Sequence, residues 1–174
     1  MEQISRTQQT FLDLVNAHPG VMHRLCRVYA ADVEDRRDLW QQIMLQLWKS
    51  YPSYDGRASF STWMFRVALN AALMHCRGRS RRPPTIALDD PAFHPPAAPD
   101  RAPPDDVHHL YAAIAELAPI DRAVAVLKLE DRALQEIAEI TGLSAGAVSV
   151  RLVRITEKLR RALGVEDDSD KEKK

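Results

Sequence analysis

The chain of 174 residues is poor in cysteine and glycine, and it lacks any long apolar run. Two cysteines are too few for a disulfide framework. Only six glycines and no alternating runs of β-branched residues favour helices over sheets. No stretch is apolar over the length that spans a bilayer, and residues 1–6 have no apolar core typical of a signal peptide. We therefore expect a cytoplasmic, all-α protein without membrane insertion.

The cysteines, Cys26 and Cys76, each lie in an apolar helical pattern, which predicts two buried thiols. His23 and His75 stand close to them in the sequence, so a zinc site is the alternative. Adjacent His75 and Cys76 would point in different directions on a helix, which disfavours that geometry. The pair His108-His109 is expected on a helix surface, with no matched nucleophile. We expect no catalytic residue, metal or cofactor.

A net charge of zero hides a division along the chain. Residues 1–82 carry 12 Lys and Arg against 7 Asp and Glu, residues 83–106 carry 1 against 5, and residues 107–174 carry 11 against 12. Eight of the 11 prolines lie in the acidic segment. Because proline removes backbone donors and interrupts helices, this segment predicts a flexible linker at 83–105 between domains at 5–82 and 106–164. The charged tail, 165–174, is expected to be disordered.

Apolar periodicity predicts four helices in each domain. We place them at residues 7–17, 21–31, 36–51 and 61–76, and then at 107–117, 121–129, 134–141 and 145–163. His18-Pro19-Gly20 is expected to end the first helix, and Ser61 is expected to cap the fourth.

Residues 134–151 have the pattern of a helix-turn-helix. Gly142 can adopt the left-handed conformation just past a helix end, and Ser144 can cap the next helix. That helix carries five Lys and Arg against one Glu, as expected if it holds phosphates and reads base edges. An ordinary helical hairpin with a solvated charged face is the alternative. The predicted duplex contacts are Ser144, Ala145, Ala147, Val148, Ser149, Arg151, Arg154 and Lys158.

A second nucleic-acid signal lies at residues 54–82. Aromatic side chains next to a basic groove are a common arrangement for holding single-stranded DNA. Core packing is the alternative for Trp63, and solubility beside a linker is the alternative for the arginines. The predicted single-strand contacts are Phe60, Trp63, Asn70, Arg77, Arg79, Arg81 and Arg82.

Residues 38–49 predict a helix with more large apolar side chains than one buried stripe needs. Leu39, Ile43 and Leu47 form one row, and Trp40, Met44 and Trp48 form the next. Exposure of part of this surface would mark a protein interface, whereas complete burial is the alternative.

Together these residues resemble the extracytoplasmic-function (ECF) sigma factors of bacterial RNA polymerase. Residues 38–48 are similar to that family's DLxQExFLxLW helix, residues 59–70 to its F-x-T-W-L-x-R-I-A-x-N pattern, and residues 136–152 to its EIA…GTVKSRL motif. The resemblance implies that residues 60–82 contact the promoter −10 element, which adds Ser61, Thr62 and Arg66 to the single-strand contacts, and that residues 144–158 contact the −35 element. It also implies core polymerase (β′ clamp and β flap), promoter DNA and an anti-sigma factor as partners. The implied polymerase contacts are Asp38, Leu39, Gln41, Gln42, Leu45 and Trp48.

Two segments depart from the family pattern. Gln42 stands where the polymerase-binding helix usually has glutamate, and residues 146–151 read GAVSVR instead of GTVKSR. The loss of threonine, lysine and serine removes phosphate or base contacts from the recognition helix.

The sequence therefore predicts a sigma factor that directs core polymerase to specific promoters and assists promoter melting. Two alternatives stay open. A stand-alone helix-turn-helix regulator would leave residues 38–82 unused, and a helical protein-interaction adaptor would show no effect on DNA.

Overall fold

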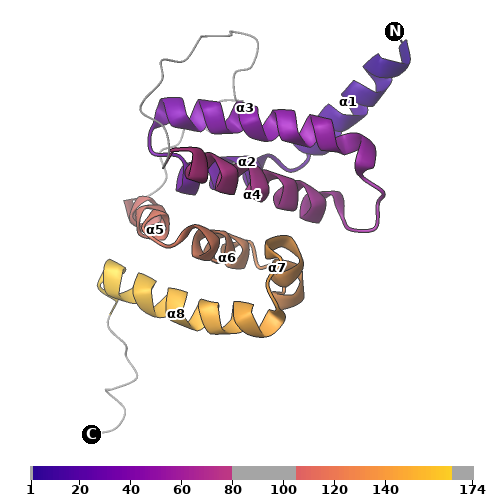
Figure 1. Cartoon of the computed structure of the whole chain (residues 1–174). Helices are drawn as coiled ribbons and strands as arrows, with labels where there is room; N and C mark the ends of the chain where they lie inside the picture. Colours follow the sequence, from indigo (N-terminus) through magenta and orange to yellow (C-terminus); the bar gives the residue numbers. More distant parts are fainter. Residues whose placement is uncertain (1, 80–104, 166–174) are drawn as a thin grey trace, which may run out of the picture.

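The computed structural model describes residues 2–79 and 105–165, and within them it contains helices and turns but no strand. The all-α prediction and the eight predicted helices are confirmed in this part of the chain (Figure 1). In chain order the elements are α1 (Glu2–Asn16), α2 (Pro19–Tyr29), α3 (Val33–Ser50), the 3-10 turn η1 (Tyr51–Ser53), α4 (Phe60–Arg79), α5 (Asp105–Ala115), α6 (Pro119–Leu129), α7 (Leu134–Thr141) and α8 (Ala145–Leu163).

Two helix starts differ from the sequence-based expectation. α1 ends at Asn16, ahead of Pro19, but Pro19 and Gly20 form the first turn of α2 and do not separate the two helices. Proline fits there because the first N–H groups of a helix have no intrahelical acceptor. The prediction of Ser61 as a cap was wrong. Ser59 caps α4 instead, and its Oγ accepts a hydrogen bond from the Thr62 N–H at 3.1 Å.

The helices form two groups that pack on each other (Figure 1). α2, α3 and α4 contact one another, and α5 and α6 lie between α2 and α8. α7 contacts α4 on one side and α8 on the other. The buried apolar side chains of both groups belong to one hydrophobic cluster. The predicted linker and tail lie almost entirely outside the described residues.

The row on α3 that the sequence predicted to be apolar supplies much of the first group's core. Leu39, Ile43 and Leu47 have no solvent-exposed surface, and Trp40 is also buried. The neighbouring positions are less enclosed, since Met44 is half-buried and Trp48 is partly exposed. α3 therefore has one fully buried face and a second, partly apolar face that is open to solvent.

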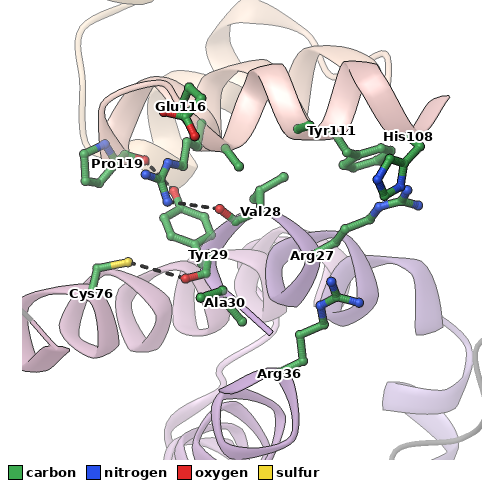
Figure 2. A pocket seen from close by; sticks show the side chains of 14 residues that line it. Arg27, Val28, Tyr29, Ala30, Arg36, Cys76, His108, Tyr111, Glu116 and Pro119 are labelled. Carbon is green, nitrogen blue, oxygen red and sulfur yellow. Dashed lines mark hydrogen bonds between the residues drawn. The ribbon is translucent and has the colours of Figure 1, made fainter. Parts of the chain in front are cut away.

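The two groups are joined by hydrogen bonds between α2 and α6. The Tyr29 hydroxyl donates to the carbonyl oxygen of Pro119 at 2.5 Å. Arg122 donates from Nη1 to the Val28 carbonyl at 3.0 Å and from Nε to the Leu117 carbonyl at 2.8 Å. Figure 2 shows Tyr29 pointing from α2 toward Pro119, beside a cavity of about 700 Å³. Polar contacts at helix ends thus fix how the groups sit together.

The cysteines lie on the α2 and α4 sides of this junction. Cys26 is buried, as predicted, and burial raises the pKa of its thiol to about 12. Cys76 is only half-buried, so the prediction of a buried thiol is wrong for it, and its thiol lies 3.8 Å from the Tyr29 carbonyl oxygen. Burial also raises the pKa of the Tyr29 hydroxyl, which therefore stays a hydrogen-bond donor at physiological pH.

We expect Tyr29→Phe to lower the free energy of unfolding by about 1 kcal/mol, because a buried hydrogen bond between the two groups is lost. Urea titration followed by circular dichroism measures the change. Tyr111→Phe is the matched control, since the Tyr111 ring lies under the Arg27 guanidinium and that contact does not need the hydroxyl. Equal destabilisation by both variants would contradict the assigned role of the Tyr29 hydroxyl.

Candidate nucleic-acid interfaces

α7 and α8 form the predicted helix-turn-helix. Gly142 ends α7 in the left-handed region, with φ of 72°, and its N–H donates to the Ala138 carbonyl at 2.9 Å. Ser144 caps α8, since its Oγ accepts a hydrogen bond from the Ala147 N–H at 3.2 Å. Both predicted roles are confirmed. The turn is therefore determined by local residues, and it fixes the start of α8.

The buried face of α8 includes one residue that we predicted to contact DNA. Val148 has no exposed surface, and it packs in the core with Ile137, Ile140 and Ile155. The prediction of a DNA contact for Val148 therefore needs correction, because the side chain holds α8 against α7 and α6. Ser144, Ala145 and Ser149 are exposed, Ala147 is half-buried, and their predicted DNA contacts stay predictions.

The basic residues of α8 differ in their surroundings. Arg151 forms an ion pair with Asp121 of α6, with Nη1 and Oδ1 2.6 Å apart, and it is half-buried. Arg161 pairs with Glu157 one turn earlier on α8. Arg154 and Lys158 are exposed. Arg151 therefore braces α8 on α6, whereas Arg154 and Lys158 extend from the open side of the helix.

The outward face of α8 also carries two residues that the sequence-based assignment missed. Val150 is 53% exposed and Val153 is 69% exposed. They lie three residues apart and on the side opposite Val148. Helical spacing applied to residues 145–163 would have found them, since both fall outside the apolar stripe that contains Val148, Leu152 and Ile155.

The N-terminal end of α4 carries the aromatic residues predicted to hold single-stranded DNA. Tyr51, Tyr54, Phe60 and Trp63 form a cluster with ring centroids between 5.1 and 6.5 Å apart. Phe60 is buried within it, so its predicted DNA contact needs correction for this conformation. Trp63 is half-buried and packs against the core, which leaves one part of its side chain accessible.

Two further predicted DNA residues at this end, Ser61 and Thr62, are covered by α7 and the turn before it. Arg132 donates to the Ser61 Oγ, and Thr62 donates from Oγ1 to Glu136 Oε1 at 2.8 Å. Arg132 also pairs with Glu136. The four side chains form a polar network between the two helical groups, and in this arrangement Ser61 and Thr62 are both buried.

The remaining predicted residues of α4 follow one exposed stripe. Arg66, Asn70 and Arg77 are exposed at positions that share a helix face, and Met74 on the same stripe is 70% exposed. The side chain of Arg79 and all of Arg81 and Arg82 lie outside the described residues. α4 therefore has a polar, basic face that α7 does not cover.

The open face of α3 carries most of the predicted polymerase contacts. Asp38 and Gln42 are exposed, Gln41 is half-buried, and Leu45 and Trp48 are 50% and 37% exposed. Leu39 is fully buried, so the prediction of a direct partner contact for it needs correction. Its role is to support the helix from the core side.

The histidines near the cysteines have partners of their own. His75 lies with Nε2 2.7 Å from Asp35 Oδ1 and with Nδ1 3.1 Å from Gln42 Oε1. The His23 ring packs on Trp40 at 4.8 Å between centroids, and burial lowers the His23 pKa. His108 and His109 are exposed on α5, as predicted. Among the described residues, no group of three His, Cys, Asp or Glu could hold a metal ion, and no helix is long and apolar enough to cross a membrane.

Comparisons with known proteins match both helical groups. Residues 14–82 match the family Sigma-70 region 2, and residues 109–159 match Sigma-70, region 4. The RNA polymerase sigma factor CarQ of Myxococcus xanthus is 33% identical over 159 residues, which cover 90% of this chain and 91% of that protein. The chain belongs to the ECF sigma factors.

Other relatives agree with this family. The ECF RNA polymerase sigma factor SigW of Bacillus subtilis is 26% identical over 171 residues and covers 90% of each chain. Two solved structures share the fold. CnrH in complex with the cytosolic domain of CnrY has a TM-score of 0.66 at 22% identity, covering 92% of this chain and 91% of CnrH. The sigma factor RpoE of Bartonella quintana, in complex with the anti-sigma factor NepR, has a TM-score of 0.64 at 18% identity. The match covers 93% of this chain and 99% of the RpoE chain.

As an ECF sigma factor, the chain directs core RNA polymerase to promoters. Because residues 14–82 match region 2 and residues 109–159 match region 4, neither the stand-alone helix-turn-helix regulator nor the helical adaptor accounts for the whole chain. From here on, region 2 denotes α1–α4 and region 4 denotes α5–α8.

We expect Glu136→Ala to loosen the contact between α7 and α4, because the carboxylate accepts from Thr62 and pairs with Arg132. Hydrogen exchange of the amides in α7 and in the first turn of α4 should accelerate by roughly tenfold. Exchange followed by mass spectrometry measures this. Glu139→Ala, an exposed glutamate on the same helix, is the matched control. Identical exchange in both variants would show that the Glu136 network does not hold the regions together.

Proposed function

We propose that this sigma factor meets core polymerase, the −10 element and the −35 element through three separate surfaces on α3, α4 and α8. The observation that carries this proposal is their placement. α3 and α8 lie on opposite sides of the molecule, and the N-terminal end of α4 lies between the regions (Figure 1). Because the surfaces on α3 and α8 do not overlap, polymerase and upstream duplex DNA can be bound at the same time, also after the two regions have separated.

The polymerase surface consists of Asp38, Gln41, Gln42, Leu45 and Trp48 on the open face of α3. Its exposed leucine and tryptophan lie among polar residues, a composition typical of interface centres with polar rims. The resemblance to the family's DLxQExFLxLW helix supports the β′ clamp as the partner of this face. The β flap is the proposed partner of region 4, on the resemblance alone.

We expect Leu45→Asp to weaken binding to sigma-free core polymerase by roughly tenfold or more, because a charge would enter the apolar centre of the interface. Fluorescence anisotropy with labelled full-length protein measures the affinity, and promoter-specific transcription in vitro should fall in parallel. Val33→Asp is the matched control, since Val33 is 61% exposed at the first residue of the same helix. Unchanged affinity for Leu45→Asp would remove this face from the polymerase interface.

The −35 surface is the open side of α8, with Ser149, Arg154 and Lys158 as its polar contacts. In a helix-turn-helix the second helix enters the major groove with its N-terminal part, and basic residues further along contact phosphates. Ser144, Ala145 and Ala147 lie at that N-terminal part. Arg151 contributes by fixing the orientation of α8 on α6 through its ion pair with Asp121.

We expect Arg154→Ala to weaken holoenzyme binding to promoters of different sequence by a similar factor. The slope of log affinity against log salt concentration should fall by about 1, because one phosphate contact and its released counterion are lost. Filter binding at several salt concentrations measures the slope. Lys128→Ala, with the same loss of charge at an exposed position of α6, should leave it unchanged. A slope unaltered by Arg154→Ala would exclude a phosphate contact.

The −10 surface comprises Ser61, Thr62, Trp63, Arg66, Asn70 and Arg77, and Arg79, Arg81 and Arg82 are proposed to extend it. Capture of an extruded base needs stacking and polar contacts from the start of α4. Ser61 and Thr62 are bonded to Arg132 and Glu136, so region 4 must leave this position before they can contact DNA. Binding to polymerase is the step at which we place this separation.

The remaining assignments rest on membership of the family. The linker at residues 83–105 would let the regions at 5–82 and 106–164 separate. RNA synthesis belongs to the polymerase, so the chain itself carries no enzymatic step, and its place of action is the cytoplasm. The two structural neighbours were solved with NepR and with the cytosolic domain of CnrY, which supports an anti-sigma factor as a further partner.

A further inference from the structure

The open face of the recognition helix is apolar where it would meet bases. Val150 and Val153 are the exposed valines described above, and Gly146 extends the same stripe toward the start of α8. A single exposed apolar residue needs no explanation. Two neighbouring valines on the most outward face of an otherwise basic helix do need one, because β-branched residues are also weak helix formers.

Nothing in the described part of the chain covers these valines. α8 contacts α5, α6 and α7, and it lies at the edge of the molecule away from α2, α3 and α4 (Figure 1). On a helical projection Val150 and Val153 lie opposite Val148 and Ile155, which fill the core. The valines therefore extend from the side of α8 that faces away from region 2.

The spacing of the stripe matches the floor of the major groove. Residues three apart on a helix have Cβ atoms about 5–6 Å from each other. Successive base pairs are about 3.4 Å apart along the duplex. Val150 and Val153 therefore reach the same base pair or two neighbouring ones.

The chemistry of valine limits what it can read there. Its side chain has no donor or acceptor, so it cannot pair with the N7, O6, N6, O4 or N4 atoms of the base edges. The one apolar group that bases present in the major groove is the thymine 5-methyl. A valine also has a single strongly preferred rotamer in a helix, so little side-chain freedom is lost on contact.

We propose that Val150 and Val153 determine −35 specificity by packing on thymine 5-methyl groups of neighbouring T·A base pairs. The inference rests on the proposed function, in which α8 reads the −35 element. Ser149 and Arg154 flank the stripe and supply polar contacts. The stripe thus binds duplex DNA. The alternative that the test must exclude is a protein bound upstream of the promoter that contacts the same valines.

The test uses full-length protein with core polymerase. Promoters are first selected from a DNA library randomised over the −35 window. Each thymine of the selected sequence is then replaced, one at a time, by deoxyuridine, which pairs identically and lacks only the methyl group. We expect neighbouring replacements to weaken holoenzyme binding about three- to fivefold each, as expected for losing one buried methyl.

Variants of the valines identify the reader of each methyl. In Val150→Ser and in Val153→Ser, one deoxyuridine replacement each should cease to matter, while core binding and helix content stay normal. Val165→Ser is the matched control, because Val165 is exposed just beyond α8, and it should keep both penalties.

The possible failures are distinguishable. If selection yields no preferred upstream sequence, the −35 role of α8 fails and the inference fails with it. If a sequence is selected but every deoxyuridine replacement is neutral, the proposed function stands and methyl recognition is overturned. If the serine variants still lose affinity at both deoxyuridine replacements, the valines do not contact the thymine methyl groups. If these variants lose only activator-dependent transcription, the stripe binds a protein partner instead.

Discussion

The arrangement of the molecule depends on the contact between the end of α2 and the start of α6. The last carbonyls of a helix lack intrahelical donors, and they carry the negative end of the helix dipole. Arg122 supplies a cationic donor to one of them, at Val28, and also lies over the Tyr29 ring. Tyr29 in turn donates to Pro119. Because Val28 and Tyr29 end α2 and Pro119 begins α6, small rotations of region 4 relative to region 2 would break these hydrogen bonds together.

This junction decides which surfaces are open. With α6 fixed on α2, the short turn at 130–133 brings α7 against the start of α4, and α8 is left on the outside. The proposed polymerase face of α3 and the proposed DNA-reading face of α8 therefore stay accessible, while the polar residues Ser61 and Thr62 are engaged by Arg132 and Glu136. The network replaces water at these side chains. Such a polar contact can be exchanged for DNA contacts at modest cost in free energy.

Local signals in the sequence predicted local structure well. Gly142 and Ser144 act through bonds within three or four residues, and the α3 core row follows from one helical period. Contacts between distant segments carried no such signal. Thr62 meets Glu136 across 74 positions and Arg151 meets Asp121 across 30, and nothing in their spacing specifies these pairs. For Val148 the helical period predicts the core face and membership of the recognition helix predicts a DNA contact, and its burial confirms the first of these predictions. Val150 and Val153 are not among the predicted contacts, because basic residues give a sequence signal for phosphate binding and exposed valines give none.

The charge distribution leads us to expect promoter reading by the complex with polymerase rather than by the free chain. Phosphate contacts supply most non-specific affinity, yet on α8 Asp121 engages Arg151 and Glu157 engages Arg161. With a net charge of zero, the chain as a whole has no net attraction to DNA, so any electrostatic attraction comes from its locally basic faces. Two weak DNA-binding sites bind DNA more tightly when a third molecule holds them at a fixed spacing, because the second binding event then becomes intramolecular. Core polymerase supplies that spacing for region 2 and region 4. We therefore expect the free chain to bind DNA weakly and to discriminate between promoters once polymerase has positioned the two regions.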